Sequence, residues 1–360
     1  MKNPYRRSRK KTPSTISAKF DAQKIAFAPL TFQAVHTMLN LGILKFLDEI
    51  NPTPATVQEI TTRCNITEYA ASTLMEVGTE IGVVEKTEDD AYIITLLGQN
   101  FLHDKMTKVN MNFVQDMCYL GAKELEKSFI NGKPEGLKVF AEGDTIYPHL
   151  STLPEKARKS WYEFDHFYSD NSFADVMPIL FKHNPKMIFD IGGNTGKFSL
   201  CCFDYNSDVE VAIIDLPEQI ATAKQTMKTK GLLDRSHFHE INMLDKTSEI
   251  PKNADIIWMS QFLDCFSKDE IVDILKKTVV AMGDKTRLFI LEPFWDCQTF
   301  PAAKYSLIHT SLYFACMANG NSKMYSKDDM LDCLKKAGIN SVLTHSNIGE
   351  NDYTLLECKK

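Results

Sequence analysis

One stretch, residues 186–199, constrains the fold of this chain more than any other. Its first half, residues 187–191, is a short apolar run with a single acid, Asp190, and turn residues follow it directly. Such a run is typical of a buried parallel strand. The glycines that follow allow positive φ and a close approach of a ligand to the backbone. These glycines are Gly192, Gly193 and Gly196. The stretch predicts a strand, a tight turn and a helix whose first N–H groups face a ligand.

The spacing of these glycines differs from the dinucleotide-binding fingerprint, which needs glycines at i, i+2 and i+5. Counted from Gly192, those two positions hold Asn194 and Lys197. The stretch fits the pattern D-x-G-G-x-x-G instead, from Asp190 to Gly196. A turn of this kind suits a nucleoside linked to an amino acid, which brings no pyrophosphate. Asn194 tolerates left-handed backbone geometry better than most residues, so the turn is compatible with it.

A second acid supports a nucleoside ligand. Residues 209–215 predict another strand, which ends at Asp215, 19 residues after Gly196. In α/β nucleotide-binding folds an acid at about this distance, on the tip of the second strand, hydrogen-bonds a ribose diol. The alternative is that Asp215 caps the helix that Leu216 and Pro217 begin. The glycine turn upstream favours the ribose role.

Five motifs, taken together, resemble those of one enzyme family. They are Asp190-Ile-Gly-Gly-Asn-Thr-Gly196, Ile214-Asp-Leu-Pro217, Ile241-Asn-Met-Leu244, Asp255-Ile-Ile-Trp-Met-Ser-Gln-Phe-Leu-Asp264 and Phe266-Ser-Lys-Asp-Glu270. Over roughly residues 20–358 the chain resembles the S-adenosylmethionine-dependent O-methyltransferases that include plant caffeate and flavonoid enzymes and acetylserotonin O-methyltransferase. The resemblance implies an α/β fold: a class I methyltransferase doubly wound sheet, mostly parallel with a terminal antiparallel hairpin, preceded by a helical, winged-helix dimerisation domain. It also implies S-adenosyl-L-methionine as cofactor and S-adenosyl-L-homocysteine as product.

Composition excludes several other classes of protein. A net charge of −6 argues against general nucleic-acid binding, which needs a basic balance. The nine cysteines are scattered without a C-x-x-C motif, which predicts neither a disulfide framework nor a zinc site and suits a reducing cytoplasm. No His/Cys/Asp cluster has metal-ligand spacing, and no apolar run approaches the length of a transmembrane helix. We therefore expect a cytoplasmic protein without a metal, a nucleic-acid partner or a membrane partner.

The N-terminal part predicts a protein–protein module. Apolar residues recur at helical spacing over residues 19–48, where Pro29 kinks or breaks the helix. Residues 53–103 resemble a winged helix, but its second helix, residues 67–82, carries three glutamates and no lysine or arginine. A DNA-recognition helix needs cationic and amide donors. The charge pattern therefore favours protein contacts, and the family resemblance implies a homodimer formed through this domain.

From residue 186 the chain alternates between predicted strands and helices, which is typical of a parallel sheet with helices on both faces. The strand candidates are 187–191, 209–215, 236–241, 255–260 and 287–292, with a terminal hairpin over 341–345 and 353–358. The predicted organisation is a disordered basic tail over 1–17, a winged-helix dimerisation domain over 18–105, a helical connector that lines the acceptor pocket over 106–180 and an S-adenosylmethionine-binding domain over 181–360.

Methyl transfer to a hydroxyl needs in-line positioning and removal of a proton. In the family that this chain resembles, a histidine after the fourth strand is the general base, and two glutamates support it. Here Asp264 stands at the histidine position, Glu292 matches the first glutamate and Met324 replaces the second. We expect Asp264 to be the base with Glu292 beside it. The alternative is that Asp264 only orients the acceptor through a hydrogen bond.

The same resemblance implies the remaining site residues. Those expected at the cofactor are Asp190, Gly192, Gly193, Gly196, Asp215, Leu216, Asn242, Met243, Ser260 and Ser169. Those expected at the acceptor are Asp165, Tyr168, His309, Asn319 and Met324. Most aromatics of residues 161–169 are equally compatible with packing between domains, and His309 with an interface position.

The sequence thus predicts an O-methyltransferase that transfers a methyl group to a hydroxyl of a small aromatic or polyketide-like molecule and acts as a homodimer. Because the base differs from histidine, transfer to nitrogen or carbon on the same scaffold remains an alternative. A catalytically inactive S-adenosylmethionine-binding regulator is a third possibility.

Overall fold

The computed structural model describes residues 14–360, apart from the side chains of Ser169 and Asp170. The chain divides into two units: Met1–Asn112 and Phe113–Lys360. This boundary lies later than the predicted residue 105, because helix α7, Lys105–Phe113, begins there and continues to the end of the first unit. None of the helices in the described part of the chain is long and apolar enough to cross a membrane.

The first unit is mostly helical, with a small antiparallel sheet in the order β1-β3-β2. Its helices are α1 (Thr15–Ala26), α2 (Ala28–Asn40), α3 (Ile43–Ile50), α4 (Val57–Cys64), α5 (Glu68–Glu80) and α6 (Leu96–His103). Its strands are β1 (Ala55–Thr56), β2 (Val84–Lys86) and β3 (Ala91–Ile94). These elements confirm the predicted helical dimerisation domain and its β-hairpin.

Local sequence signals explain where these helices begin. Thr56 and Glu59 form a reciprocal capping box at the start of α4, and Thr67 caps α5. Pro29 lies in the first turn of α2, and the helix is interrupted at Phe27, as the sequence predicted. The core of the unit comes from helices α2 to α6 and the hairpin, with fully buried side chains that include Met38, Leu44, Leu47, Ile60 and Met75.

The predicted disordered tail is only partly covered by the structure. Its residues 1–13 lie outside the described residues. The prediction is wrong for residues 15–17, which belong to helix α1 because Ser14 accepts a hydrogen bond from the Ser17 N–H at 3.1 Å and caps it.

The second unit is built on a seven-stranded sheet in the order β6-β5-β4-β7-β8-β10-β9. Its strands are β4 (Met187–Ile191), β5 (Glu210–Asp215), β6 (Ser236–Glu240), β7 (Ile256–Ser260), β8 (Arg287–Glu292), β9 (Ser341–Ile348) and β10 (Tyr353–Lys359). The strands up to β8 pair in parallel, and β10 pairs antiparallel with β8 and β9. All seven predicted strands are present, and the terminal hairpin is confirmed.

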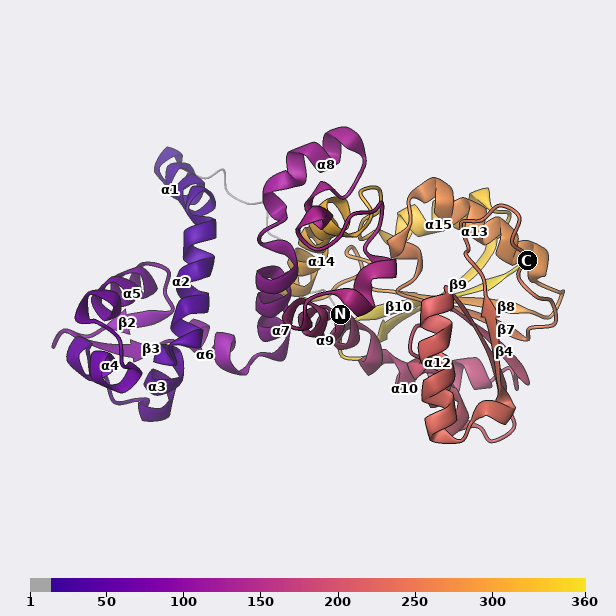
Figure 1. Cartoon of the computed structure of the whole chain (residues 1–360), viewed down its shortest axis with the longest axis horizontal. Helices are drawn as coiled ribbons and strands as arrows, with labels where there is room; N and C mark the ends of the chain where they lie inside the picture. Colours follow the sequence, from indigo (N-terminus) through magenta and orange to yellow (C-terminus); the bar gives the residue numbers. More distant parts are fainter. Residues whose placement is uncertain (1–13) are drawn as a thin grey trace. The chain divides into compact units, whose positions relative to one another are not determined.

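Helices cover both faces of this sheet (Figure 1). One face packs against α13 (Lys268–Ala281) and α15 (Lys327–Lys336), through Ile271, Leu275 and Leu334. The other face packs against helices on the opposite side, which are α10 (Phe173–Phe181), α11 (Lys197–Tyr205) and α12 (Pro217–Lys230). Because the strands are buried on both sides, they appear in the sequence as continuous apolar runs.

The connector is less helical than predicted. It contains α8 (Leu125–Asn131) and α9 (Glu155–Ser169), whereas the chain between them forms short 3-10 turns over Glu135–Val139 and Tyr147–Thr152. Proline and glycine residues are frequent in that stretch and explain the loss of regular helix. Helix α14 (Pro301–Tyr313) and a π-helical turn, Phe314–Ala318, contact this region from the C-terminal half.

Candidate active site

The glycine turn between β4 and α11 adopts the predicted left-handed geometry. Gly192 has φ +74° and Gly196 has φ +83°, while Asn194 takes φ +49°. A Cβ at Gly192 would lie 2.4 Å from the Phe262 ring, and a Cβ at Gly196 would lie 2.5 Å from Cε of Met227. Both glycines are therefore needed for backbone conformation and for close packing of neighbouring side chains.

Asp215 ties this turn to the tip of β5. One of its carboxylate oxygens accepts a hydrogen bond from the Asn194 N–H at 2.9 Å, and the other accepts one from the Leu216 N–H at 2.7 Å. Burial raises the pKa of Asp215, while these two N–H donors lower it. Leu216, not Asp215, occupies the N-cap position of α12. Each oxygen keeps a further lone pair for a ligand hydroxyl.

Asp190 lies at the base of the turn and is buried. It accepts a hydrogen bond from the Ser199 hydroxyl at 2.7 Å. Burial raises its pKa to about 7. This acid supports the strand–turn–helix geometry and also borders a cavity behind the glycines, which Ser260 lines as well.

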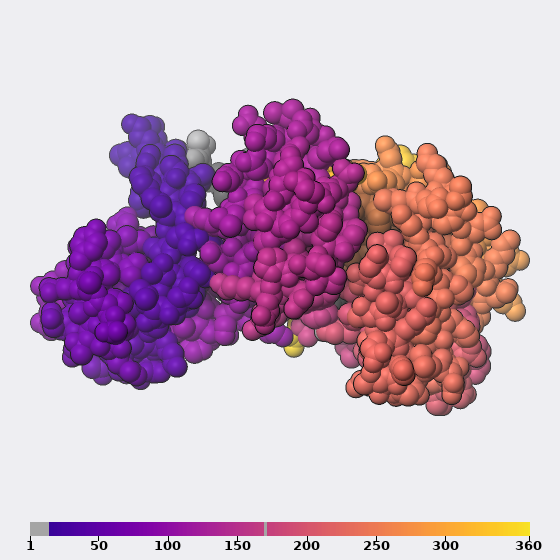
Figure 2. Space-filling model, in the orientation of Figure 1, coloured from indigo at the N-terminus to yellow at the C-terminus, as the bar shows by residue number. Residues whose placement is uncertain are grey.

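A cavity of about 850 Å³ opens at the carboxyl ends of the parallel strands. Its volume lies within the usual range for ligand sites. The sheet side contributes Gly192, Asn194, Asp215, Leu216, Asn242 and Met243. The connector contributes Tyr147, Leu150, Trp161 and Asp165, and the segments that follow β7 and α14 contribute Phe262, Cys265, Phe266 and Asn319. The magenta surface of the connector borders the red and orange surface of the sheet elements in the space-filling view (Figure 2).

The loop after β6 is held by hydrogen bonds from a half-buried lysine. Lys277 of α13 donates to the Met243 carbonyl at 2.9 Å and to the Ser248 hydroxyl at 3.0 Å. The Leu244 N–H donates to Oδ1 of Asn242 at 2.9 Å. That hydrogen bond leaves the amide NH₂ of Asn242 as a donor for a ligand in the cavity.

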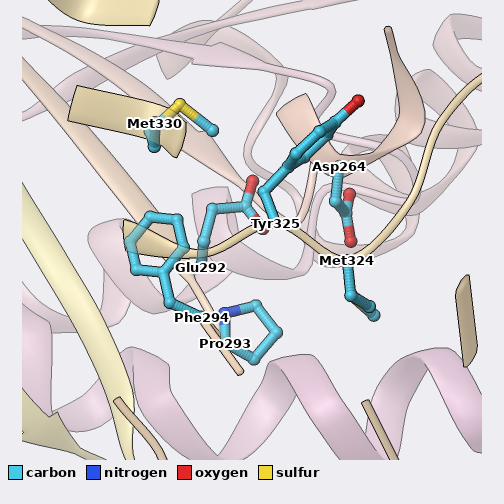
Figure 3. A pocket seen from close by; sticks show the side chains of 7 residues that line it. All are labelled: Asp264, Glu292, Pro293, Phe294, Met324, Tyr325 and Met330. Carbon is cyan, nitrogen blue, oxygen red and sulfur yellow. The ribbon is translucent and has the colours of Figure 1, made fainter. Parts of the chain in front are cut away.

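The two predicted catalytic acids lie around a small cavity of about 10 Å³, with Pro293, Phe294, Met324, Tyr325 and Met330 (Figure 3). Oε1 of Glu292 accepts hydrogen bonds from the N–H groups of Phe262 and Leu263, at 3.3 and 3.1 Å. Its Oε2 is buried and has no hydrogen-bond partner among the described residues. The cavity volume of about 10 Å³ corresponds to about one water molecule.

Burial perturbs both acids strongly. It raises the pKa of Asp264 to about 7, the Cys265 thiol lowers that pKa, and the nearby carboxylate of Asp165 raises it further. Burial, together with the charge of Asp264, raises the pKa of Glu292 well above its ordinary value. The Cys265 thiol lies 3.6 Å from Oδ1 of Asp264. Burial therefore favours the protonated form of Glu292, whereas Asp264, with a pKa of about 7, can gain or lose a proton near neutral pH.

Three of the five predicted acceptor residues line one of these cavities. Asp165 and Asn319 line the large cavity, and Met324 lines the small one beside Asp264. Asn319 is fixed by a hydrogen bond from its amide to the Cys265 carbonyl at 2.6 Å. Met324 lies next to the acids because its segment follows the π-helical turn back toward β8.

Two predicted acceptor residues lie elsewhere. Tyr168 is buried against the rings of Phe164 and Phe167, so its side chain packs in the connector instead of lining the large cavity. His309 lies on the exposed side of α14, where its ring stacks on Tyr305 and shares a hydrogen bond with the Tyr305 carbonyl at 2.8 Å. The side chain of Ser169 lies outside the described residues.

Tyr147, Cys265 and Lys277 contribute to the site but were missed from the sequence. Tyr147 lines the large cavity with a buried hydroxyl that has no partner in the described part of the chain. Cys265 could have been found, since it follows the predicted base directly. Lys277 had no sequence signal, because its contacts join residues about thirty positions apart. No group of three metal-binding side chains occurs among residues 14–360 as described.

Comparisons with known proteins identify the family. Residues 19–92 match the Dimerisation2-like domain, and residues 175–340 match the O-methyltransferase domain. Together these matches span about two thirds of the chain.

Individual relatives are distant. A mitomycin biosynthesis 6-O-methyltransferase from Streptomyces lavendulae is 26% identical over 42% of this chain and 40% of its own length. The O-methyltransferase SfmM3 from the same organism is 21% identical over 75% of this chain and 79% of its own length. Among solved structures, the O-methyltransferase NcsB1 from neocarzinostatin biosynthesis has a TM-score of 0.63 at 18% identity, covering 91% of this chain and 95% of that one.

The NcsB1 structure contains S-adenosylmethionine and 2-hydroxy-5-methyl naphthoic acid. At this identity the structural likeness shows the fold alone, and it agrees with the seven-stranded sheet and the preceding helical unit. The two domain matches confirm the resemblance inferred from the five sequence motifs. The chain belongs to the S-adenosylmethionine-dependent O-methyltransferase family whose members join a dimerisation domain to an O-methyltransferase domain.

Proposed function

We propose that the protein transfers the methyl group of S-adenosylmethionine to a hydroxyl of a small aromatic or polyketide-like molecule. The observation that carries this proposal is the buried acid Asp264, whose pKa is about 7, next to an aromatic-walled cavity that ends at a nucleoside-binding turn. A hydroxyl must lose a proton during methyl transfer. An amine free base already has a lone pair, so a dedicated base favours a hydroxyl acceptor.

The cofactor end of the cavity has groups that match a nucleoside. Asp215 offers free lone pairs to the ribose hydroxyls, and the amide of Asn242 and the buried side chain of Met243 border the adenine position. When bound, S-adenosylmethionine supplies a methyl group on a positively charged sulfur. The chain's own residues orient that group and exclude water from it.

The acceptor end has aromatic walls and a few polar groups. Trp161, Phe262 and Phe266 supply flat apolar surface, and the Trp161 indole is fixed by its hydrogen bond to the Tyr313 hydroxyl at 2.7 Å. The unpartnered hydroxyl of Tyr147 is available to orient a polar substituent. The NcsB1 structure contains 2-hydroxy-5-methyl naphthoic acid, an aromatic compound with a hydroxyl group, which supports an aromatic acceptor.

The proton affinity of Asp264 supports its role as general base. Moving a proton from a phenol of pKa about 10 to an ordinary Asp of pKa about 3.9 costs about 8 kcal/mol, against about 5 for a histidine of pKa about 6.5. With the pKa of Asp264 at about 7, the same transfer costs about 4 kcal/mol. Burial therefore gives an aspartate the basicity of the histidine that it replaces.

Glu292 supports the base without accepting the proton itself. Its Oε1 accepts hydrogen bonds from the N–H groups of Phe262 and Leu263 and thereby fixes the 3-10 turn Leu263–Cys265, which carries Asp264. Its buried Oε2 becomes a hydrogen-bond donor when it is protonated, and Glu292 lines the small cavity that it shares with Asp264, where a single water fits. A donor there stabilises the ionised form of Asp264.

The protein acts as a homodimer through the first unit. Among the described residues, helix α1 buries no side chain, and five large apolar residues of α1, α2 and the position between them are exposed. They are Ile16, Phe20, Ile25, Phe27 and Leu30. Such patches are rare on monomers, and the match to a dimerisation domain supports a second copy as the partner.

Light scattering tests this assembly. The chain should have twice its monomer mass at micromolar concentration, and Phe20→Glu with Leu30→Glu should shift it to the monomer. Val280→Glu, at an exposed position of α13, is the matched control and should leave the mass unchanged. A monomeric wild-type chain would refute the dimer.

The catalytic proposal is tested with purified protein, S-adenosylmethionine and a panel of phenols and hydroxylated polyketides. We expect S-adenosylhomocysteine and an O-methylated product, identified by mass and by NMR of the new methyl group. Products methylated only on nitrogen or carbon would contradict the hydroxyl acceptor. Cofactor binding with no product from any panel member, together with salt-sensitive nanomolar DNA binding, would support the regulator.

A further inference from the structure

The proposed base and the proposed acceptor site lie at different cavities. Asp264 lines the small cavity of about 10 Å³, which has room for one water molecule but not for an aromatic ring. The described residues that line the large cavity do not include Asp264, which is only 6% exposed. An acceptor hydroxyl in the large cavity therefore needs a group that passes its proton on to Asp264.

Cys265 connects Asp264 with the large cavity. It lines that cavity, and its thiol donates a hydrogen bond to Oδ1 of Asp264 over 3.6 Å, a longer distance than for nitrogen or oxygen because sulfur is a larger atom. Both residues belong to the 3-10 turn Leu263–Cys265, in which the Leu263 N–H donates to Oε1 of Glu292 at 3.1 Å. The thiol is thus the point at which the large cavity reaches the buried carboxylate.

The Cys265 thiol keeps its proton at neutral pH. Burial raises its pKa well above the ordinary value, and the negative charge of Asp264 raises it further. A thiol has a weak S–H donor and a sulfur that is a weak acceptor. The same side chain can therefore give a proton to Asp264 and take one from a hydroxyl in a single step, without forming a thiolate.

The neighbours of Cys265 hold its backbone in place. The Asn319 amide donates to the Cys265 carbonyl at 2.6 Å, and the Tyr325 hydroxyl donates to the next carbonyl, that of Phe266, at 2.7 Å. Tyr147 lines the same cavity, and burial and the nearby Cys265 thiol both raise the pKa of its hydroxyl. The thiol therefore has a fixed position on the cavity wall, beside a hydroxyl that can orient an acceptor oxygen.

We propose that Cys265 is the proton relay of the methyl transfer: its thiol proton passes to Oδ1 of Asp264 while its sulfur takes the proton of the acceptor hydroxyl. The hydroxyl oxygen forms a bond to the methyl carbon as the bond between that carbon and the cofactor sulfur breaks, and this sulfur keeps the electron pair. Cys265 ends the step as a thiol and Asp264 as a neutral acid. The inference rests on the proposed function, because it takes a hydroxyl acceptor in the large cavity and Asp264 as the final base.

The test compares two acceptors in single-turnover reactions. One is a phenol that the wild-type protein methylates, such as catechol, and the other is its nitro derivative, such as 4-nitrocatechol, which is already ionised at pH 8 and needs no relay. Cys265→Val removes the S–H and fills its space with a methyl group, which keeps out a replacing water. Relative to wild type, it should slow transfer to the phenol about 100-fold and transfer to the nitro derivative about threefold or less.

Further variants separate the relay from a packing role. Cys265→Ser keeps a side chain that donates and accepts, so its transfer to the phenol should lie within about tenfold of wild type. Cys297→Val makes the same change as Cys265→Val at a half-buried cysteine that does not line the large cavity, and it should leave both rates unchanged. If thermal unfolding shows that Cys265→Val does not fold, Cys265→Ala should give the same difference between the two acceptors. Equal slowing with both acceptors, or an unchanged rate with the phenol, would overturn the relay.

A second measurement needs no acceptor. The infrared S–H band of Cys265, taken as the difference between wild type and Cys265→Ser, should shift as the pH rises through 7, because ionised Asp264 accepts the hydrogen bond more strongly. Asp264→Asn should abolish the shift, and a band in wild type that does not respond to pH would overturn the contact on which the relay depends. A wild-type protein that shows the shift but methylates no compound of the panel would overturn the proposed function instead.

Discussion

Asp215 accepts a hydrogen bond from the backbone N–H of Asn194 at 2.9 Å, so the acid at the tip of β5 fixes the glycine turn that follows β4. The carboxylate therefore has two tasks. It accepts the hydrogen bond that fixes the backbone of the turn, and its remaining lone pairs are available to a ligand in the large cavity. A substitution at this position changes both the ligand contact and the shape of the turn.

We expect Asp215→Ala to weaken S-adenosylhomocysteine binding by about 1–3 kcal/mol, which is the range for lost hydrogen bonds to a charged group. Asp215→Asn keeps one acceptor for a backbone N–H and should therefore lose less affinity for S-adenosylhomocysteine. Calorimetry measures both variants. Unchanged affinity in Asp215→Ala would contradict the ribose role of this acid.

The sequence predicted the sheet and the turn well because their signals are local. Each parallel strand is an apolar run with turn residues at its ends, and residues 187–191 are found as predicted. The lining of the cavity depends on contacts between distant residues. The hydrogen bond from Trp161 to Tyr313 joins positions 152 residues apart, and no pattern within either segment reveals it.

The positions of Tyr168 and His309 were hard to predict for the same reason. The family resemblance assigned each residue to the pocket-facing side of a helix, Tyr168 on α9 and His309 on α14. Which side of a helix faces the pocket depends on the elements that the helix packs against. Tyr168 faces Phe164 and Phe167, and His309 faces outward beside Tyr305. The two proposed catalytic acids were easier to locate, because Glu292 is the last residue of β8 and Asp264 lies in the turn just after β7.

Glu292 provides a prediction about protonation. Burial favours the protonated form of this carboxyl, and its Oε1 accepts hydrogen bonds from two N–H groups, so Glu292→Gln keeps the acceptor and a donor at the second position. We expect that variant to lie within about 1 kcal/mol of wild type in free energy of unfolding, whereas Glu292→Ala should lose about 3 kcal/mol or more. Urea denaturation measures both. A large loss in Glu292→Gln would mean that this carboxyl is ionised in the folded protein.

Asp190 provides a prediction about stability and pH. Its pKa is about 7 in the folded protein and about 3.9 in an unfolded chain, so the folded state binds more protons between these values. Its contribution to stability is therefore full below about pH 4 and is lost as the pH rises through 7. Asp190→Asn removes this titration and should stabilise the ligand-free protein at pH 8, by at most about 4 kcal/mol.

Thermal unfolding at pH 5.5 and pH 8 checks this result. The difference between the two pH values should be smaller in Asp190→Asn than in wild type. Asp204→Asn, on the same helix as Ser199 and exposed, serves as the control. An equal pH dependence in Asp190→Asn and wild type would place the pKa of Asp190 outside this range.

Asp264 gives the most direct test of the chemistry. If its ionised form accepts the proton of the acceptor, kcat/KM should rise about tenfold per pH unit below 7 and level off above it. Asp165→Asn removes a negative neighbour and should move this limb to lower pH by about one unit or less, because burial remains the larger cause. If Asp165→Asn leaves the pH dependence of kcat/KM unchanged, the titrating group is not Asp264.

Asp264→Asn keeps the shape of the side chain and removes the base. We expect kcat to fall about 100-fold or more, the size of a positioned general base, and the rising limb near pH 7 to disappear. Affinity for S-adenosylhomocysteine should stay unchanged, because Asp264 lies with Met324 around the small cavity and not at the cofactor end. If Asp264→Asn retains a kcat near that of wild type at neutral pH, Asp264 only orients the acceptor. The proton of the acceptor must then go to another group that borders the large cavity.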